Sequence, residues 1–163
     1  MLTQSINIYT DGSCHTQLCT GAWVSIIFIN EEKIILSGTA LQTTHNRMEL
    51  LAIIEALKYV QNNYTNSNLI TVITDSQYVT GLQAREAKFT DQQYTTKKGN
   101  EISNVDLVKT LLKLINILPV TFIKIKAHQK KSDIVNYNIE ADILSRNMVR
   151  NMVKGDVILS NKY

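Results

Sequence analysis

Proline, cysteine and long apolar runs are scarce in this sequence, and each shortage excludes a class of protein. Pro119 is the only proline among 163 residues, so no proline-rich linker divides the chain. Two cysteines are too few for a disulfide scaffold. No run of about 18 apolar residues is present to span a membrane, and the first residues lack the pattern of a secretory signal. We therefore expect a cytoplasmic protein with one domain, residues 1–154, and a tail, residues 155–163.

The overall composition is that of an ordinary globular protein. Hydrophobic residues make up 44% of the chain and charged residues 19%, which argues against a disordered protein. The formal net charge is +3. This excess of positive charge permits a polyanionic partner without requiring one.

Apolar periodicity predicts strands first and then a helix. Residues 5–9, 20–30 and 33–40 are β-branched or alternate between polar and apolar, and their short links predict an antiparallel meander. Over residues 46–59 the apolar residues recur at spacings of three and four, which predicts an amphipathic helix. The first third of the chain therefore forms three strands that lead into a helix.

The remaining elements alternate between strands and helices, and the sequence predicts them at residues 69–74 (strand), 104–117 (helix), 120–125 (strand) and 138–153 (helix). The order predicts an α/β fold with a mixed five-stranded sheet: three antiparallel strands, then parallel strands, flanked by helices. Residues 83–103 are polar and basic and fit neither period. We expect them to form either a solvated loop or a helical excursion that projects from the surface.

Four acidic residues stand at corresponding places in these elements. Asp11 ends the first predicted strand and Asp75 ends the fourth, while Glu49 and Asp142 lie near the starts of two helices. Strand ends and the helix starts that follow them meet at one edge of an open α/β sheet. A right-handed crossover would also make the first and fourth strands neighbours. We therefore expect the four carboxylates to gather at one edge.

Such a cluster is unstable without compensating charge. Two carboxylates about 6 Å apart repel by roughly 3 kcal/mol at an effective dielectric near 20. Protonation or bound cations must offset this repulsion, and oxygen ligands without cysteine or histidine favour Mg²⁺ or Mn²⁺ over zinc. Two such ions about 4 Å apart would activate water on one side of a phosphodiester and stabilise the leaving oxygen on the other.

Four segments together resemble type 1 ribonuclease H of the compact bacterial kind. They are residues 10–13 (TDGS), 46–50 (NRMEL), 74–79 (TDSQYV) and the closing series His128, Asn138 and Asp142. The resemblance extends from residue 5 to about 150. It implies a monomeric endoribonuclease that cuts the RNA strand of an RNA–DNA hybrid and leaves 5′-phosphate and 3′-hydroxyl ends.

The resemblance also assigns a role to each candidate residue. It makes Asp11, Glu49, Asp75 and Asp142 the catalytic ligands of two Mg²⁺ ions, for which Mn²⁺ can substitute, with Asp11 bridging both. It makes His128 a catalytic loop histidine that assists proton transfer or product departure. Glu49 would also touch a ribose 2′-hydroxyl, a contact that distinguishes RNA from DNA. The substrate-binding residues implied are Ser13, Cys14, Asn46, Gln77 and Asn138, of which Asn138 also supports the histidine loop.

Two features depart from the usual family pattern. Residues 14–20 replace an asparagine and several glycines, and residues 83–103 lack the tryptophans of the basic protrusion found in compact bacterial members.

A zinc site or a disulfide is suggested by Cys14, His15 and Cys19. A fourth zinc ligand is missing, and the cytoplasm disfavours the disulfide. Lysines leading into the His128 loop are expected to hold backbone phosphates; they are Lys124, Lys126, Lys130 and Lys131.

Other interpretations remain open at this point. An aspartate before glycine or serine is often only a turn former, and Glu49 alone would complement the helix dipole. The fold would also suit a non-catalytic hybrid-binding domain, another nuclease such as a transposase or resolvase, or the ribonuclease H domain of a reverse transcriptase. The presence of all four acids argues for catalysis, because acids hinder the simple binding of a polyanion.

Overall fold

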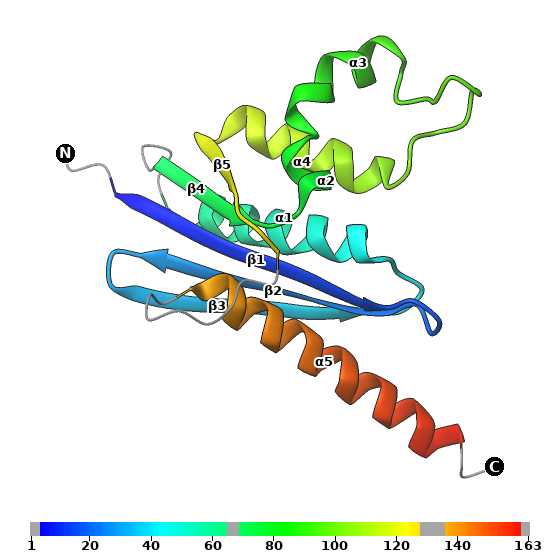
Figure 1. The fold of residues 1–163 in the computed structure, drawn as a ribbon. Coiled ribbons are helices and arrows are strands. Elements are labelled where there is room, and N and C mark those ends of the chain that lie inside the picture. Colours follow the sequence, from blue (N-terminus) through cyan, green and yellow to red (C-terminus); the bar gives the residue numbers. More distant parts are fainter. Residues whose placement is uncertain (1–3, 65–68, 128–135, 161–163) are drawn as a thin grey trace.

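The computed structural model describes residues 4–64, 69–127 and 136–160. Its centre is a five-stranded sheet in the order β3-β2-β1-β4-β5 (Figure 1). Strands β1 to β3 are antiparallel, whereas β4 and β5 add to the sheet in parallel. The mixed sheet predicted from the sequence is therefore confirmed. The strands are β1 (Ser5–His15), β2 (Thr20–Ile29), β3 (Glu32–Ala40), β4 (Leu69–Thr74) and β5 (Val120–Lys124).

One face of the sheet is covered by α1 (His45–Asn63) and α4 (Val105–Ile117). Ile6 and Ile8 alternate along β1 and are fully buried against this layer, as the period of two in a strand requires. Thr44 starts α1: its hydroxyl accepts a hydrogen bond from the backbone N–H of Arg47 at 3.3 Å. This cap fixes the start of the helix that carries Glu49.

The opposite face of the sheet is covered by α5 (Tyr137–Ser160), which continues past the end of the strands (Figure 1). Tyr9 and Val24 face α5 and pack in one cluster with Ala141 on this helix. The helix predicted from the sequence ends at residue 153, which is too early. Gly155 does not stop the helix because a single glycine in a helix costs only about 1 kcal/mol relative to alanine.

Residues 83–103 project from the body of the protein beside α4 (Figure 1). After the short α2 (Gln77–Thr80) come a 3₁₀ turn (Gln83–Arg85) and α3 (Glu86–Asp91). Phe89 is almost fully buried and stacks on Tyr94 with ring centroids 5.9 Å apart. The segment combines the two expectations: residues 83–91 form the helical excursion, whereas residues 92–103 form turns and loop with one isolated bridge between Thr95 and Glu101. The contact between Phe89 and Tyr94 joins the two parts.

No helix in the described residues is both long enough and apolar enough to cross a membrane.

Candidate active site

Three of the predicted acids converge just beyond the end of the parallel pairing between β1 and β4. Carboxylate oxygens of Asp11, Glu49 and Asp75 all lie within 4.8 Å of one another, and the described residues form no other group of three potential metal ligands. The parallel pairing of β1 with β4 ends at Tyr9 and Ile73, so Asp11 and Asp75 stand just beyond it. Asp11 was predicted at the end of its strand, but β1 runs on to His15. Asp11 therefore lies within the strand.

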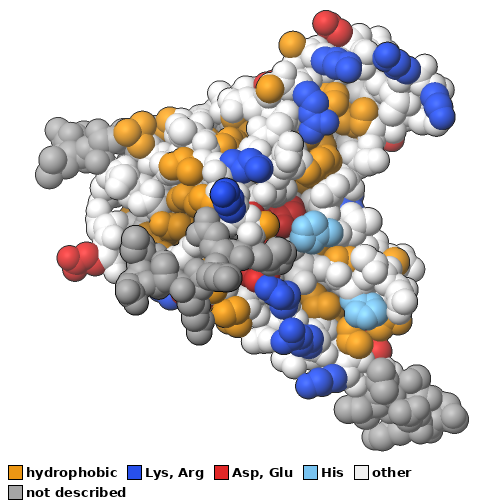
Figure 2. Space-filling model, in the orientation of Figure 1, with side chains coloured by type: hydrophobic (Ala, Val, Ile, Leu, Met, Phe, Trp, Pro, Cys, Tyr) orange, Lys and Arg blue, Asp and Glu red, His pale blue; other side chains and the backbone are white. Residues whose placement is uncertain are grey.

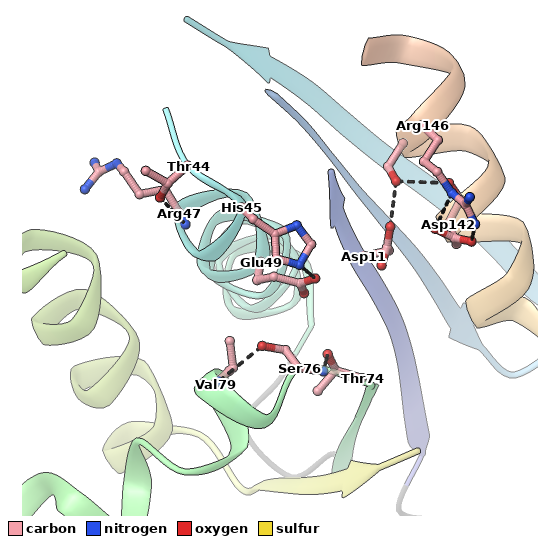
Figure 3. A network of polar contacts seen from close by, with 11 residues as sticks. Asp11, Thr44, His45, Arg47, Glu49, Thr74, Ser76, Val79, Asp142 and Arg146 are labelled. Carbon is pink, nitrogen blue, oxygen red and sulfur yellow. Dashed lines mark hydrogen bonds and ion pairs between the residues drawn. The ribbon is translucent and has the colours of Figure 1, made fainter. Parts of the chain in front are cut away.

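The turn after β4 is held by its own hydrogen bonds (Figure 3). The backbone N–H of Ser76 donates to the hydroxyl of Thr74 at 3.1 Å. The hydroxyl of Ser76 in turn accepts from the backbone N–H of Val79 at 3.3 Å and caps α2. Asp75 lies between these two bonds, so its backbone is held where the strand becomes a helix.

Glu49 reaches the site because α1 packs very closely against β1. A Cβ atom placed on Gly12 would lie 2.5 Å from the backbone nitrogen of Glu49, which only glycine permits. The Glu49 side chain is 1% exposed, and its Oε1 lies 3.3 Å from Nε2 of His45. Its Oε2 is buried and has no hydrogen-bond partner among the described residues. A buried carboxylate oxygen without a partner is costly, and a cation would satisfy it.

Burial and mutual repulsion raise the pKa of these acids. Burial, more than any other cause, raises the pKa of Asp11 to about 7, with further repulsion from Asp142 and Asp75. A hydrogen bond from Ser145 opposes this rise. Burial also raises the pKa of Glu49 well above its usual value, and repulsion from Asp11 adds to the effect. The predicted need of this cluster for a proton or a cation is therefore visible in its electrostatics.

Asp142 lies at the margin of the cluster and has a different partner. It lines the same cleft as the other three acids, but the guanidinium of Arg146 binds its carboxylate, with Nε 2.8 Å from Oδ1 (Figure 3). The neighbouring Ser145 donates its hydroxyl hydrogen bond to Oδ2 of Asp11 at 2.6 Å. α5 therefore contributes two residues that the sequence analysis missed. The spacing of four between Asp142 and Arg146 is a signal from which their ion pair could have been predicted. Nothing in the sequence identifies Ser145.

The cleft around the acids has a volume of about 350 Å³. A sequence profile of the ribonuclease H family matches residues 3–150 of this chain. The chain belongs to the ribonuclease H family. Enzymes of this family act on RNA–DNA hybrids and generally use a divalent metal ion, which the acidic cluster suits.

Individual relatives agree with this assignment to the ribonuclease H family. The ribonuclease H of Caldicellulosiruptor saccharolyticus is 33% identical over 151 residues, covering 91% of this chain and 99% of that protein. The ribonuclease H of Ehrlichia canis is 34% identical over 143 residues, covering 87% and 92%. The chain is accordingly a ribonuclease H enzyme.

A solved structure shows the same fold. The crystal structure of LC9-RNase H1, described as a type 1 RNase H with the type 2 active-site motif, superposes with a TM-score of 0.77. The match covers 93% of this chain and 74% of that one, at 20% sequence identity. At this identity the likeness establishes the fold of this ribonuclease H alone.

The residues expected to bind substrate are distributed unequally around the cleft of this ribonuclease H. Ser13, Asn46 and Gln77 line it together with the acids. Asn138 lines an adjoining pocket that it shares with Asp142 and Arg146. Cys14 is not among the lining residues, and its thiol contacts the carbonyl oxygen of Thr43 at 3.6 Å. The geometry therefore places three of the five in the cleft itself.

The remaining predicted residues of this ribonuclease H are the loop histidine, the lysines near it and the two cysteines. His128, Lys130 and Lys131 lie outside the described residues, so their assigned roles stay predictions. Lys126 lines the pocket beside Asp142. Both cysteines are free, and the Cys19 thiol contacts the carbonyl oxygen of Thr16 at 3.5 Å. In the described part of the chain, the cysteines and His15 form no metal-binding group.

Proposed function

We propose that this enzyme hydrolyses the RNA strand of RNA–DNA hybrids with two divalent ions, leaving 5′-phosphate and 3′-hydroxyl ends. Mg²⁺ is the proposed ion, and Mn²⁺ can replace it. The observation that carries the proposal is the convergence of Asp11, Glu49 and Asp75, with a buried Glu49 oxygen that lacks a partner in the described chain. Hard carboxylate oxygens without sulfur or imidazole match the donors that Mg²⁺ and Mn²⁺ prefer.

The metal ligands in this proposal are Asp11, Glu49, Asp75 and Asp142. When bound, the two ions supply an activated water and charge stabilisation at the leaving oxygen. Asp11 is oriented by the hydroxyl of Ser145, 2.6 Å away, so its carboxylate is held in place before any ion arrives. Asp142 must exchange its contact with Arg146 for a ligand role, and the exposed guanidinium is free to turn toward solvent or substrate.

Substrate recognition in this proposal depends on the backbone of the hybrid. Asn46 and Gln77 line the cleft next to the acids, where their amides can hydrogen-bond sugars and phosphates of either strand. Glu49 touches the ribose 2′-hydroxyl beside the cleaved bond, which selects RNA over DNA. Contacts of this kind read shape and sugar chemistry, so we propose cleavage without base preference. We also propose a monomer that works in the cytoplasm, which its free thiols suit.

The alternative of a non-catalytic hybrid-binding domain is disfavoured by the electrostatics of the cleft. Asp11 and Glu49 are buried acids with raised pKa values, and they stand in the cleft that a polyanion would have to enter. A surface selected only for binding nucleic acid would lack them, since each carboxylate repels phosphate. Their presence is explained by cations that are bound for chemistry.

A cleavage assay tests the proposal. Labelled RNA–DNA hybrid, double-stranded RNA and double-stranded DNA are each incubated with Mg²⁺, Mn²⁺ or a chelator. We expect cleavage of the RNA strand of the hybrid only, and only with a divalent ion. The products should have 3′-hydroxyl ends that a polymerase extends. Cleavage in chelator, or products with 3′-phosphate ends, would contradict the proposal.

Asp11→Asn supplies the decisive variant. It removes a ligand charge at nearly constant volume, so we expect a folded protein without detectable cleavage. Asp91→Asn makes the same chemical change on exposed α3 and should retain activity. Full activity in a folded Asp11→Asn protein would defeat the two-ion proposal.

His128→Ala should slow turnover far less than the loss of an acid. A loss of activity equal to that of Asp11→Asn would contradict the auxiliary role proposed for His128.

A further inference from the structure

The outward face of α5 carries a row of cations that begins at the cleft and leads away from it. Arg146, Arg150 and Lys154 follow one another at a spacing of four, and all three are exposed. Asn147 and Asn151 lie beside them on the same side of the helix. Between Asp142 and Asp156, α5 contains no acidic residue. We call these three cations and two asparagines the α5 basic face.

The packing of α5 explains why this face points outward. Ala141, Ser145 and Val149 are buried, and Met148 packs on the cluster formed by Val24 and other sheet residues. Arg146 directly follows Ser145 and Arg150 directly follows Val149. Each arginine is therefore turned away from the buried side of the helix and faces solvent. In Figure 2, Lys and Arg side chains gather along α5 on one side of the acidic centre and over the projecting segment on the other.

The charges of this face are only partly neutralised. Arg146 pairs with Asp142, but neither Arg150 nor Lys154 is in an ion pair with an acid of the described chain. The one hydrogen bond of the Arg150 guanidinium within that part of the chain goes to Asn147, at 3.4 Å. Two full positive charges with their donors are thus left for an external partner.

The length of the face matches a stretch of nucleic-acid backbone. At a rise of 1.5 Å per residue, Arg146 and Lys154 are about 12 Å apart along the helix axis. Phosphates of one strand in a duplex repeat about every 3.4 Å along its axis, so the face spans roughly three or four of them. Because Arg146 also lines the cleft, the row continues directly from the proposed active site.

A membrane-surface role fits the same face poorly. Helices that lie on membranes place large apolar residues beside their cations. Among the α5 side chains that the structure describes, residues 137–156, Ile143 is the one exposed large apolar residue, and it lies at the end next to the cleft. Asparagines occupy the other positions between the cations, and amides hydrogen-bond readily to phosphates and sugars.

We propose that the α5 basic face binds phosphates of the hybrid where the duplex leaves the cleft. The inference rests on the proposed function, because the duplex in the cleft is the substrate assumed there. Arg150 and Lys154 make sequence-independent contacts that hold the duplex, and they take no part in the chemical step. Their contribution is to substrate affinity and to its salt dependence.

The test is the salt dependence of hybrid binding, measured by fluorescence anisotropy in chelator so that no cleavage occurs. Each phosphate that the protein no longer neutralises makes the plot of log K against log salt shallower by about one unit. The double variant Arg150→Ala with Lys154→Ala should therefore reduce the slope by about two. In Mg²⁺ its KM should rise several-fold while kcat stays at the wild-type value.

Two further variants serve as controls. Lys58→Ala with Lys113→Ala removes the same charge from α1 and α4, which cover the other face of the sheet, and should leave the slope unchanged. Arg150→Lys with Lys154→Arg keeps both charges and should retain the wild-type slope. Circular dichroism checks that every variant is folded.

The outcomes separate this inference from the proposed function. An unchanged slope in the folded Arg150→Ala, Lys154→Ala protein overturns the α5 proposal, whatever other partner the face serves. An equal loss in the Lys58→Ala, Lys113→Ala protein overturns it too, because net charge alone would then explain the effect. If the wild-type protein cleaves the hybrid in either case, the proposed function stands. Failure of the wild-type protein to cleave any hybrid would instead remove the proposed function.

Discussion

Arg146 binds the carboxylate of Asp142 one helical turn earlier in α5, with Nε 2.8 Å from Oδ1 and a second contact from Nη2 to Oδ2. Both side chains are partly exposed, at 45% and 23%. Asp142 points its charge at this partner, which explains why it is not part of the tight group formed by Asp11, Glu49 and Asp75. Any cation that recruits Asp142 has to compete with Arg146.

Arg146→Ala should therefore tighten the binding of divalent ions. A partly exposed ion pair contributes about 0.2–1 kcal/mol, so the dissociation constant for Mg²⁺ or Mn²⁺ should fall by about one and a half- to fivefold. Isothermal titration calorimetry measures this directly. Arg150→Ala removes the same charge one turn further along α5 and should change the constant much less. Weaker ion binding by the Arg146→Ala protein would show that the guanidinium supports the site and does not compete with it.

Ser145→Ala should move the pH dependence of cleavage upward. The Ser145 hydroxyl, 2.6 Å from Asp11, lowers the pKa of that acid, and without it the pKa rises further above its value of about 7. Ionised Asp11 then appears only at higher pH. We expect the acidic limb of the kcat/KM profile to shift by up to about one pH unit. Ser25→Ala removes another buried serine hydroxyl, which binds the carbonyl of Ala52, and should leave the profile in place.

Stability in chelator should fall as the pH rises from about 4 to about 7. Folding raises the pKa of Asp11 from 3.8 to about 7, so the folded state holds a proton that the unfolded state releases over this interval. The raised pKa of Glu49 acts in the same direction. Asp11→Asn removes the Asp11 part of this loss and should be more stable than wild type at pH 8 by a few kcal/mol, on the order of 2–4. Urea unfolding at about pH 4 and at pH 8 measures the difference.

The same experiment has an internal check. Near pH 4 the wild-type and Asp11→Asn proteins should have similar unfolding free energies, because Asp11 is then protonated in the fold. Asp91→Asn on exposed α3 should follow wild type at both pH values. A gap between wild type and Asp11→Asn that stays constant with pH would contradict the titration of Asp11.

Two glycine-to-alanine substitutions should change the free energy of unfolding in opposite directions. Gly12→Ala puts a methyl group 2.5 Å from the Glu49 backbone nitrogen and 2.6 Å from the Met48 carbonyl carbon. Relief of this overlap requires α1 to move, so we expect a loss of about 1–3 kcal/mol and a marked loss of cleavage. Gly155→Ala meets nothing within 4 Å in α5 and should stabilise the helix by up to about 1 kcal/mol. Urea unfolding compares both with wild type.

Much of the architecture was predictable because periodicity is a local property. The alternation in residues 5–9 and the spacing of Leu50, Ile53 and Leu57 report which side of each element is buried, whatever packs there. The order of elements then restricts the sheet to few topologies, and the parallel pairing of β1 with β4 follows from the preferred crossover. Glu49 and Asp75 lie at the predicted points of their elements, and Asp11 joins them although β1 runs on past it.

The extent of elements was less predictable where local preference is weak. β1 runs on through Asp11 and Gly12 to His15 because β2 pairs with it along its whole length. α3 forms in a polar segment because Phe89 joins the main hydrophobic core and Tyr94 packs against it. Both the pairing with β2 and this aromatic packing join separate segments, so the hydrophobic periodicity of one segment does not reveal them.

By itself, the sequence determined the order of strands and helices and the acids that end up at one edge of the sheet, because hydrophobic spacing and acid position are written along the chain. Only the tertiary structure decided the partners of those acids. Arg146 on Asp142, Ser145 on Asp11 and the buried, unpartnered oxygen of Glu49 depend on how α5 and α1 pack on opposite faces of the sheet. Packing across the sheet sets distances between side chains far apart in sequence, and no local pattern records them.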